Sequence, residues 1–333
     1  NENWLLERLG EHKLLKLSRE RLDKPFSKEE VAAIMENLAS HKQAGPSRIP
    51  SGLFKMLSRT FAKPFADLIN ESKKTGKLPD HFLEGDIAML YKKNDREDPR
   101  NYRPITLLNG DYKIMMRVLA ARMAEAVVQF VSNSQTGFVP DAFIGENIML
   151  LKLIQAHAEE KKLDAYFVFL DMEKAFDRVS YEFLIEAMQA VGFRQNFINA
   201  VSLMYNTEKP PKRRIYANGY YSSWFQIKSG VAQGCPLSPY LFLIIMTVMF
   251  HDIKQDEELQ NELDKNKVLG TLFDEILYAD DTIIYSRSAE TLTKLVHSIQ
   301  IQGVKYGLKL NEDKCEVIQM YTSEKVYFIS ATH

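Results

Sequence analysis

The chain has 333 residues, of which 45% are hydrophobic and 26% are charged, and its formal net charge is −1. This composition excludes disordered and fibrous proteins, and the length suits two or three domains. The near-zero charge excludes a uniformly basic surface but not a basic groove that follows a phosphate backbone. One cluster of basic residues consists of Lys209, Lys212, Arg213, Arg214 and Lys228.

Residues 1–39 are predicted to be helical and amphipathic. Within them, Ser27 and Glu30 have the capping-box spacing that marks the start of a helix. A Gly-Pro turn then breaks the pattern, and a second helix is predicted from Gly52 to about Ser72. These segments are expected to supply core residues only.

A basic hairpin is predicted next, with strands at residues 86–93 and 101–108. The first strand ends in Lys92 and Lys93, and Arg103 lies on the return strand. Together these cations suit a triphosphate, although from these residues alone an ordinary basic hairpin tip is the preferred interpretation.

A short buried strand at residues 166–170 follows two predicted helices, residues 111–131 and 145–162. Asp171 comes directly after this strand. The end of a rigid core strand is a common position for a catalytic acid. A helix is predicted to begin near Ser180.

Two glycines and two prolines surround Gln233 and predict a loop whose backbone approaches a ligand closely. An apolar run at residues 239–250 follows and predicts a buried helix. The run is shorter than the roughly 20 residues that cross a bilayer.

A second hairpin is predicted at residues 275–286, with the adjacent acids Asp280 and Asp281 at its tip. Two neighbouring carboxylates repel each other, and a divalent cation relieves that repulsion. A solvated polar turn is the alternative that these residues alone leave open.

Three motifs in this order resemble the palm of a reverse transcriptase. They are Phe-x-Asp-x-x-x-Ala-Phe-Asp at residues 169–177, Gly-Val-x-Gln-Gly-x-Pro-x-Ser-Pro at 230–239, and Tyr-Ala-Asp-Asp at 278–281. Two stretches are most similar to non-LTR (LINE-type) retrotransposons: the sequence of the first motif and the run Asn-Tyr-Arg-Pro-Ile-Thr-Leu-Leu at 101–108. Group II intron maturases are the next relatives.

The resemblance implies an α+β fold, the fingers and palm of a right-hand polymerase with a ferredoxin-like palm sheet and without a thumb. It implies an N-terminal helical extension at residues 1–40, fingers at 41–165 and a palm at 166–325. A fingers-side excursion near 205–230 would interrupt the palm, and residues 326–333 would begin the connection to a thumb.

The resemblance also implies the catalytic groups of an RNA-directed DNA polymerase. Asp171, Asp280 and Asp281 would hold two Mg²⁺ ions, with Mn²⁺ as a substitute, and Asp280 would be the principal partner of Asp171. Lys314 matches a lysine proposed to protonate pyrophosphate, and a surface lysine is the alternative reading.

The remaining matched positions would bind the incoming nucleotide. Lys92 or Lys93, with Arg103, would contact the triphosphate. Phe176 would lie under the sugar and select deoxynucleotides, which also disfavours an RNA-directed RNA polymerase. Gln233 and Gly234 would lie against nucleotide and template.

The expected partners are an RNA template of retroelement origin, a DNA primer and dNTPs, with no membrane. The sparse cysteines and the lack of a signal segment lead us to expect an intracellular protein, in cytoplasm and nucleus by the resemblance. The chain departs from the family pattern at Ser47-Arg48, Asp141-Ala142 and Ala232. These departures keep a second interpretation open, a catalytically inactive retroelement remnant that at most binds nucleic acid.

Overall fold

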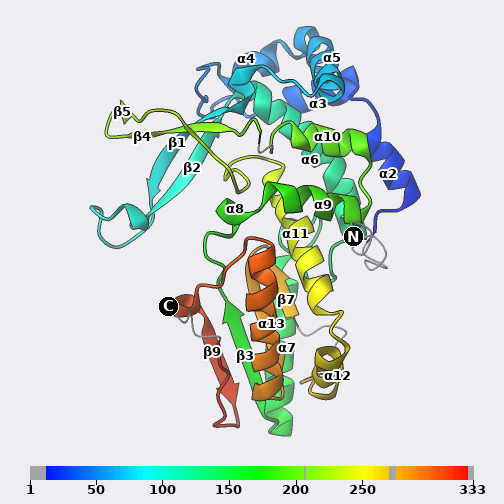
Figure 1. Ribbon diagram of the computed structural model, residues 1–333, viewed down its shortest axis with the longest axis vertical. Helices are drawn as coiled ribbons and strands as arrows, with labels where there is room; N and C mark the ends of the chain where they lie inside the picture. Colours follow the sequence, from blue (N-terminus) through cyan, green and yellow to red (C-terminus); the bar gives the residue numbers. More distant parts are fainter. Residues whose placement is uncertain (1–12, 206–207, 270–274, 329–333) are drawn as a thin grey trace. The chain divides into compact units, whose positions relative to one another are not determined.

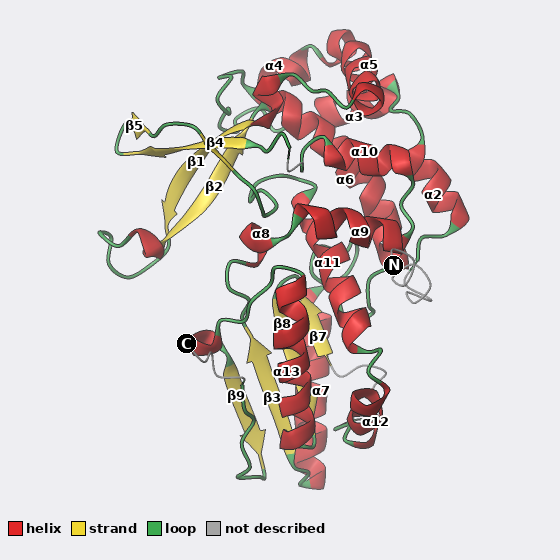
Figure 2. Cartoon of the chain, viewed as in Figure 1, coloured by secondary structure: helices red, strands yellow, loops and turns green. Residues whose placement is uncertain are grey.

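The computed structural model of the protein describes residues 13–205, 208–269 and 275–328. The chain divides into two compact units. Unit 1 comprises residues 1–13, 127–180 and 242–333, and unit 2 comprises residues 14–126 and 181–241. Each unit combines helices with a sheet, so the predicted α+β class is confirmed (Figure 2).

Unit 1 contains a four-stranded antiparallel sheet with the strand order β7-β8-β3-β9 (Figures 1 and 2). Its strands are β3 (Ala165–Leu170), β7 (Glu275–Tyr278), β8 (Asp281–Ser286) and β9 (Glu316–Met320). The central strand β3 is almost wholly buried, which explains its run of aromatic and β-branched residues. The predicted pairing of this strand with the 275–286 hairpin is confirmed.

The helices of unit 1 pack around this sheet, with α7 against β7 and α13 against β8. They are α7 (Ile144–Lys161), α8 (Ala175–Arg178), α12 (Glu257–Lys265) and α13 (Ala289–Lys305), with 3₁₀ turns η3 (Val127–Gln129) and η4 (Glu312–Lys314). Helix α11 (Ser238–Ile253) begins in unit 2 and ends in unit 1.

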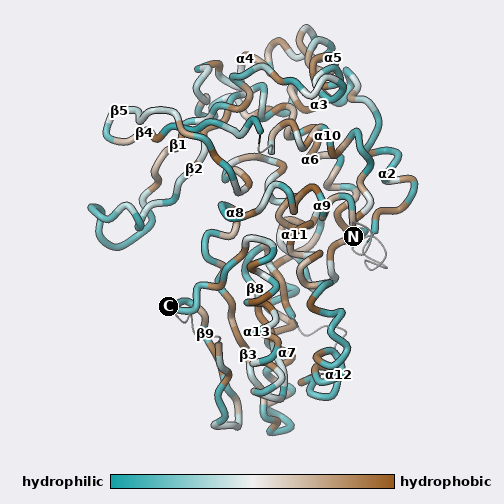
Figure 3. The backbone as a smooth tube through the Cα atoms, viewed as in Figure 1, coloured by the Kyte–Doolittle hydropathy of each residue, from teal (hydrophilic) through white to brown (hydrophobic). Residues whose placement is uncertain are grey.

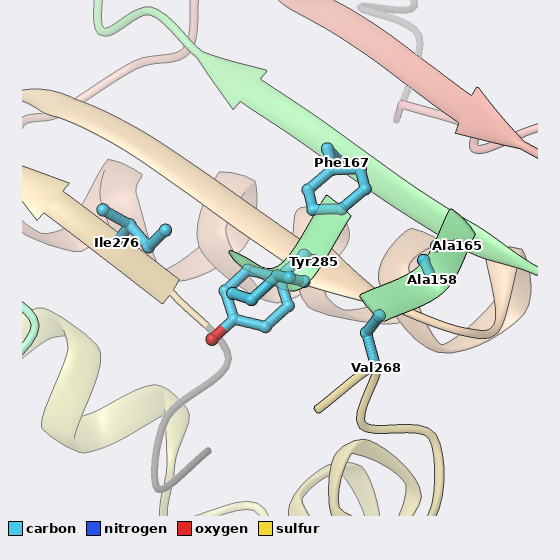
Figure 4. Packing of buried hydrophobic residues seen from close by; sticks show 7 residues of the cluster. Ala158, Ala165, Phe167, Val268, Ile276 and Tyr285 are labelled. Carbon is cyan, nitrogen blue, oxygen red and sulfur yellow. The ribbon is translucent and has the colours of Figure 1, made fainter. Parts of the chain in front are cut away.

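The core of unit 1 lies between α7 and the sheet (Figure 4). Phe167 of β3 and Tyr285 of β8 are register partners, and both are fully buried, with ring centroids 6.2 Å apart. Ile154 and Ala158 of α7 pack in the same cluster. Burial of these side chains stabilises the strand that carries Asp171 by about 1.5–3 kcal/mol for each large one.

Unit 2 contains a five-stranded sheet in which β2, β1, β4 and β5 are neighbours and β6 pairs with β4. Its strands are β1 (Glu84–Tyr91), β2 (Tyr102–Leu108), β4 (Lys212–Ala217), β5 (Tyr220–Tyr221) and β6 (Phe225–Gln226). Strands β1 and β2 form the predicted basic hairpin, whose loop is hydrophilic (Figure 3). Strand β4 runs parallel to β1.

The helices of unit 2 form a group in which α3 packs on α5 and α6, and α10 packs on α2 and α5. They are α2 (Lys16–Asp23), α3 (Lys28–Glu36), α4 (Ser51–Met56), α5 (Ser58–Thr75), α6 (Gly110–Ala126), α9 (Tyr181–Val191) and α10 (Gln195–Ser202), with 3₁₀ turns η1 (Asp80–Leu83) and η2 (Pro99–Asn101). The predicted capping box at Ser27 and Glu30 is confirmed.

Some predicted boundaries differ from those of the structure. The helix expected from Gly52 is divided at Leu57 into α4 and α5, and the helix expected to reach residue 131 ends as α6 at Ala126. Residues 1–12 and 329–333, which belong to the expected helical extension and thumb connection, lie outside the described residues. The division into fingers and palm stays a prediction.

Within the described part of the chain, no helix combines the length and the apolar character needed to span a membrane.

Candidate active site

The candidate active site begins at the end of β3, where Leu170 pairs with Thr282 of β8. The next residue on each strand is an acid, so Asp171 and Asp281 face each other where the ladder ends. The side chain of Asp171 is 38% exposed, which leaves it open to solvent and to ligands. Asp171 lies, as predicted, at the end of a buried strand.

The turn between β7 and β8 contains only Ala279 and Asp280, because Tyr278 pairs with Asp281. Ala279 has a φ of +57°, in the left-handed region of the backbone. Two-residue hairpin turns require this region, which residues other than glycine rarely adopt. The predicted hairpin with two acids at its tip is therefore present.

Partial burial and the negative charge of Asp171 raise the pKa of the Asp281 carboxyl. The charge of Asp171 is thus close enough to disfavour ionisation of Asp281. A divalent cation with oxygen ligands relieves that repulsion. The described residues contain no group of three or more His, Cys, Asp or Glu side chains placed to hold a metal ion. The fit to a metal therefore rests on this pair, with further ligands from substrate phosphate and water.

Among the described residues, Lys314 forms an ion pair with Asp171. Its Nζ lies 3.4 Å from Oδ2 of Asp171. The segment that carries it is tied to β3, because the N–H of Asn311 donates to the carbonyl of Asp171 at 2.8 Å and Met172 bridges to Leu310. The sequence match of Lys314 is therefore accompanied by proximity to Asp171.

The loop that contains Gln135 supports the turn. The side-chain oxygen of Gln135 accepts the N–H groups of Ala279 at 2.9 Å and of Gly137 at 2.8 Å. The side-chain amide of Gln135 donates back to the carbonyl of Ala279 at 3.4 Å. Gln135 also bridges to Leu277 in parallel register, so this loop extends the sheet beside β7. The short Gln-x-Gly pattern was the signal in the sequence.

Phe176 lies on α8 and is half-buried. Its ring stacks on that of Phe242 with a centroid distance of 4.7 Å, and it meets Phe138 edge-on at 6.5 Å. Such pairs fix a ring more firmly than burial alone. The structure thus gives Phe176 one rigid orientation.

The predicted triphosphate group lies in unit 2. Arg103 on β2 pairs with Leu90 of β1, and the N–H of Lys92 donates to the carbonyl of Asn101 at 2.9 Å. Lys92, Lys93 and Arg103 are all exposed at one end of the hairpin. The hairpin thus brings these three cations together.

The Gln233 loop also lies in unit 2, beside β2. The carbonyl of Gln233 accepts the N–H of Thr106 at 3.0 Å. Gly234 has a φ of +110°, and a Cβ there would lie 2.8 Å from the carbonyl oxygen of Thr106. Glycine at this position therefore lets the loop backbone lie directly against β2, and the predicted approach to a ligand stays a prediction.

A buried polar network holds this loop in place. Ser238 Oγ donates to the carbonyl of Ala232 at 2.9 Å and lies 3.3 Å from the hydroxyl of Tyr205. The hydroxyl of Tyr112 donates to Cys235 Sγ at 3.5 Å, and burial raises the pKa of Tyr112 well above its ordinary value. These tyrosines therefore stay neutral hydrogen-bonding groups.

Comparison with known proteins assigns the family. Residues 91–332 match the family model described as "Reverse transcriptase (RNA-dependent DNA polymerase)". The chain is 26% identical over 298 residues to the uncharacterized 149 kDa protein of transposon TX1 from Xenopus laevis, covering 89% of this chain and 22% of that protein.

Two further relatives are polymerases of mobile elements. The R2 Pol polyprotein of Nasonia vitripennis is 23% identical, covering 91% of this chain and 28% of its own length. The jockey RNA-directed DNA polymerase of Drosophila funebris is 26% identical, covering 87% and 31%. The chain therefore spans between a fifth and a third of these relatives.

Solved telomerases share the fold. Apo telomerase from Candida tropicalis, truncated from its C-terminal domain, superposes with a TM-score of 0.52 at 14% identity, covering 79% of this chain and 56% of that one. The same telomerase in complex with a TWJ fragment of telomeric RNA gives a TM-score of 0.50 at 16% identity, covering 79% of this chain and 45% of that one.

Reverse transcriptases generally use divalent metal ions, and the facing acids at the end of β3 are residues of the matched region. The chain belongs to the reverse transcriptase (RNA-dependent DNA polymerase) family, as a reverse transcriptase domain of the non-LTR retrotransposon type.

Proposed function

We propose that this chain is the catalytic core of an RNA-directed DNA polymerase. It would transfer a nucleotide from a dNTP to the 3′-hydroxyl of a DNA primer on an RNA template. The observation that carries the proposal is that Asp171 and Asp281 face each other at an open strand end, with Lys314 3.4 Å from Asp171.

Asp171, Asp280 and Asp281 would hold two Mg²⁺ ions, or Mn²⁺ in their place. When bound, such ions lower the pKa of the attacking hydroxyl and neutralise charge on the transferred phosphoryl group. The carboxylates orient the site, and the repulsion between Asp171 and Asp281 favours a cation there. Whether Asp280 or Asp281 is the principal partner of Asp171 is decided by comparing variants of each.

Lys314 would stabilise or protonate the leaving pyrophosphate, since a cation in reach of that oxygen lowers the barrier. Phe176 would exclude a 2′-hydroxyl from the sugar position, and its stacking on Phe242 supports this role because a fixed ring cannot move aside. Arg103 with Lys92 or Lys93 would bind the triphosphate.

Gln233 and Gly234 would lie against the nucleotide and the template. The R2 and jockey relatives come from mobile elements, and the telomerase neighbour was solved with RNA. On that basis we infer that the template is the RNA of a retroelement, and that the protein acts inside the cell, in cytoplasm and nucleus.

The test is primer extension on an RNA template with Mg²⁺, by the chain alone and by the chain joined to the downstream segment of a jockey-type relative. We expect Asp171→Ala to abolish extension, and Asp280→Asn and Asp281→Asn each to reduce it, with the larger loss marking the principal partner of Asp171. Asp67→Ala is the matched control, because its carboxylate forms only an exposed pair with Lys63. We expect Lys314→Met to slow extension about 100-fold or more, with partial recovery in Lys314→Arg.

Sugar selection provides a measurement that does not depend on the amount of folded protein. We expect Phe176→Ala to raise the ratio of ribonucleotide to deoxynucleotide incorporation. An unchanged ratio would remove the role given to Phe176. If neither form of the wild-type chain extends a primer, the inactive-remnant interpretation, suggested by Ala232 and Asp141-Ala142, replaces the polymerase.

A further inference from the structure

Unit 2 exposes an unusual group of aromatic side chains on β4, β5 and the segment that follows. Tyr216, Tyr221 and Trp224 are 43%, 39% and 39% exposed. Tyr216 and Tyr221 are register partners, and their ring centroids are 4.9 Å apart. We call these three rings, with Arg48 and Arg214, the aromatic platform.

The two arginines of the platform stack on its rings. The guanidinium carbon of Arg214 lies 4.1 Å from the ring centroid of Tyr221 and 4.6 Å from that of Trp224. The guanidinium of Arg48 lies 5.7 Å from the centroid of the same tyrosine, Tyr221, and it also donates to the Tyr221 hydroxyl. Alternating aromatic and guanidinium planes are therefore presented at the surface.

The platform is held rigidly by the sheet beneath it. Asp86 on β1 is the register partner of Arg214, and its Oδ1 accepts the Arg214 Nε–H at 2.7 Å. The side chain of Asp86 is only 4% exposed, so this ion pair with the neighbouring strand fixes the plane of the guanidinium. A fixed stacking surface loses little conformational entropy when a ligand binds.

An open hollow of about 500 Å³ lies beside Tyr216 and is also lined by Arg96 and Tyr102. Arg96 stacks on Tyr91 at 4.8 Å. The hollow therefore continues the pattern of arginines and aromatic rings toward the tip of the β1–β2 hairpin.

Positive side chains exceed negative ones around the platform. The cations are Arg48, Arg96, Arg103, Lys212 and Arg214, and the acids are Glu84, Asp86 and Glu97. Of the acids, Asp86 is already neutralised by Arg214. The charge complements a polyanion, and the rings complement flat, unsaturated groups.

We propose that the aromatic platform binds an unpaired nucleic acid strand by stacking bases on Tyr216 and Trp224, with phosphates near Arg48 and Arg214. Base stacking on aromatic and arginine planes is how single strands are bound without a sequence code. A duplex hides its base faces, so the platform selects unpaired strands. The inference relies on the proposed function only for the expectation that the chain meets nucleic acid.

The experiment measures the binding of a labelled strand of about 15 nucleotides by fluorescence anisotropy, without dNTPs or divalent metal. RNA, DNA and duplex RNA are compared. We expect Tyr216→Ala and Trp224→Ala each to weaken single-strand binding about tenfold and to leave duplex binding unchanged. Loss of RNA binding alone, or of DNA binding as well, identifies the strand that the platform takes.

Two further variants separate stacking from folding and from charge. Trp224→Phe keeps an aromatic face and is expected to bind within about threefold of the wild type. Tyr327→Ala removes a tyrosine that is 62% exposed in unit 1 and is expected to change nothing. Arg48→Gln is expected to reduce the salt dependence of binding.

The proposal is overturned if Trp224→Ala binds a single strand as the wild type does, or if it loses single-strand and duplex binding equally. Primer extension is run in parallel with all variants. Extension by the wild type together with unchanged binding by Trp224→Ala refutes the platform alone. Absence of extension together with weakened single-strand binding by Trp224→Ala refutes the polymerase alone.

Discussion

The side-chain oxygen of Gln135 accepts the backbone N–H of Ala279, the residue directly before Asp280, at 2.9 Å. Both residues are buried, and Ala279 has a φ of +57°. A left-handed backbone at a residue other than glycine persists only where its surroundings impose it. Gln135 therefore positions the acidic turn.

The first prediction concerns Gln135→Ala. This change leaves the buried N–H groups of Ala279 and Gly137 without their acceptor, so we expect a loss of about 1–3 kcal/mol in the free energy of unfolding. We also expect kcat of primer extension to fall about 10- to 100-fold with little change in KM, because displaced catalytic groups lose their alignment. Denaturant titration and steady-state kinetics measure the two effects.

Asn147→Ala is the matched control for this prediction. Asn147 donates to the carbonyl of Leu277 on β7 at 2.9 Å, so its loss removes a side-chain bond to the same hairpin but not to its tip. We expect lower stability with unchanged kcat. Equal kinetic effects of the two variants would mean that Gln135 acts only through stability.

The second prediction contrasts two glycines. A Cβ at Gly137 would lie 2.2 Å from the backbone nitrogen of Ala279 and 2.8 Å from the backbone carbon of Tyr278. Both atoms belong to the peptide group between Tyr278 and Ala279, which cannot move without shifting the acidic turn, so we expect Gly137→Ala to abolish extension and lower Tm.

A Cβ at Gly145 would lie 2.1 Å from the ring of Phe143, but Phe143 is 66% exposed, so its side chain can rotate away. Since Gly145 lies in α7, we expect alanine there to be tolerated or to stabilise by up to about 1 kcal/mol. Thermal melting of both variants decides whether the backbone contact at Gly137 is the cause.

The sequence was sufficient for the parts of the site that depend on local pattern. The strand before Asp171 and the hairpin around Asp280 are short apolar runs whose neighbours in the chain set their conformation. The capping box at Ser27 is equally local. The family resemblance then supplied the pairing of the two segments, and the register β3–β8 confirms it.

The parts that escaped prediction depend on contacts between distant segments. Gln135 meets Ala279 across 144 positions in the sequence, and a lone glutamine in a loop gives no sign of its partner. The parallel pairing of β4 with β1 is also long-range. Arg213, counted in the basic cluster, is in fact buried and donates to the carbonyl of Leu83 at 2.8 Å. The count of basic residues therefore overstated the positive charge of that surface, on which aromatic rings are also exposed.

The third prediction follows from the raised pKa of Asp281. Because burial and the charge of Asp171 make the folded state bind this proton more tightly, stability falls as pH rises from the unfolded pKa of about 3.9 through the higher folded pKa. Above that range the penalty remains. At neutral pH without divalent metal, we expect Asp281→Asn to melt higher than the wild type by about 1–2 °C, a small effect because solvent screens a carboxylate that is only partly buried.

The same pair of proteins tests metal binding. Near pH 3 the Asp281 carboxyl is protonated in the wild type too, so the difference in Tm is expected to vanish. Adding Mg²⁺ at neutral pH is expected to raise the Tm of the wild type more than that of Asp281→Asn, because a ligand of the folded state stabilises it. A Tm that responds equally in both proteins would remove Asp281 from the metal site.

The fourth prediction concerns Arg122, which joins α6 to the N-terminal helices of unit 2. Its guanidinium donates to both carboxylate oxygens of Glu30 at 2.8 Å and to the carbonyls of Leu22, Lys24 and Pro25. The Arg122 side chain is only 8% exposed. The Glu30 side chain is 37% exposed and also accepts from the N–H of Ser27, so solvent screens part of the pair, and we expect Arg122→Ala to cost about 1–3 kcal/mol of unfolding free energy.

This cost is expected to depend on pH. Burial tends to raise the pKa of Glu30, but hydrogen bonds from Arg122 and Ser27 together with the charge of Arg122 outweigh it, and the pKa is lowered overall. The stabilisation is therefore complete above the unfolded pKa of about 4.3 and is lost as pH falls through the folded value. The difference in unfolding free energy between wild type and Arg122→Ala should shrink between neutral pH and pH 3.

Arg21→Ala is the control, because its pair with Glu125 is exposed on both sides and is worth less than about 1 kcal/mol. A difference that stays constant with pH, or one no larger than that of Arg21→Ala, would show that the Arg122 contacts do not hold these helices together.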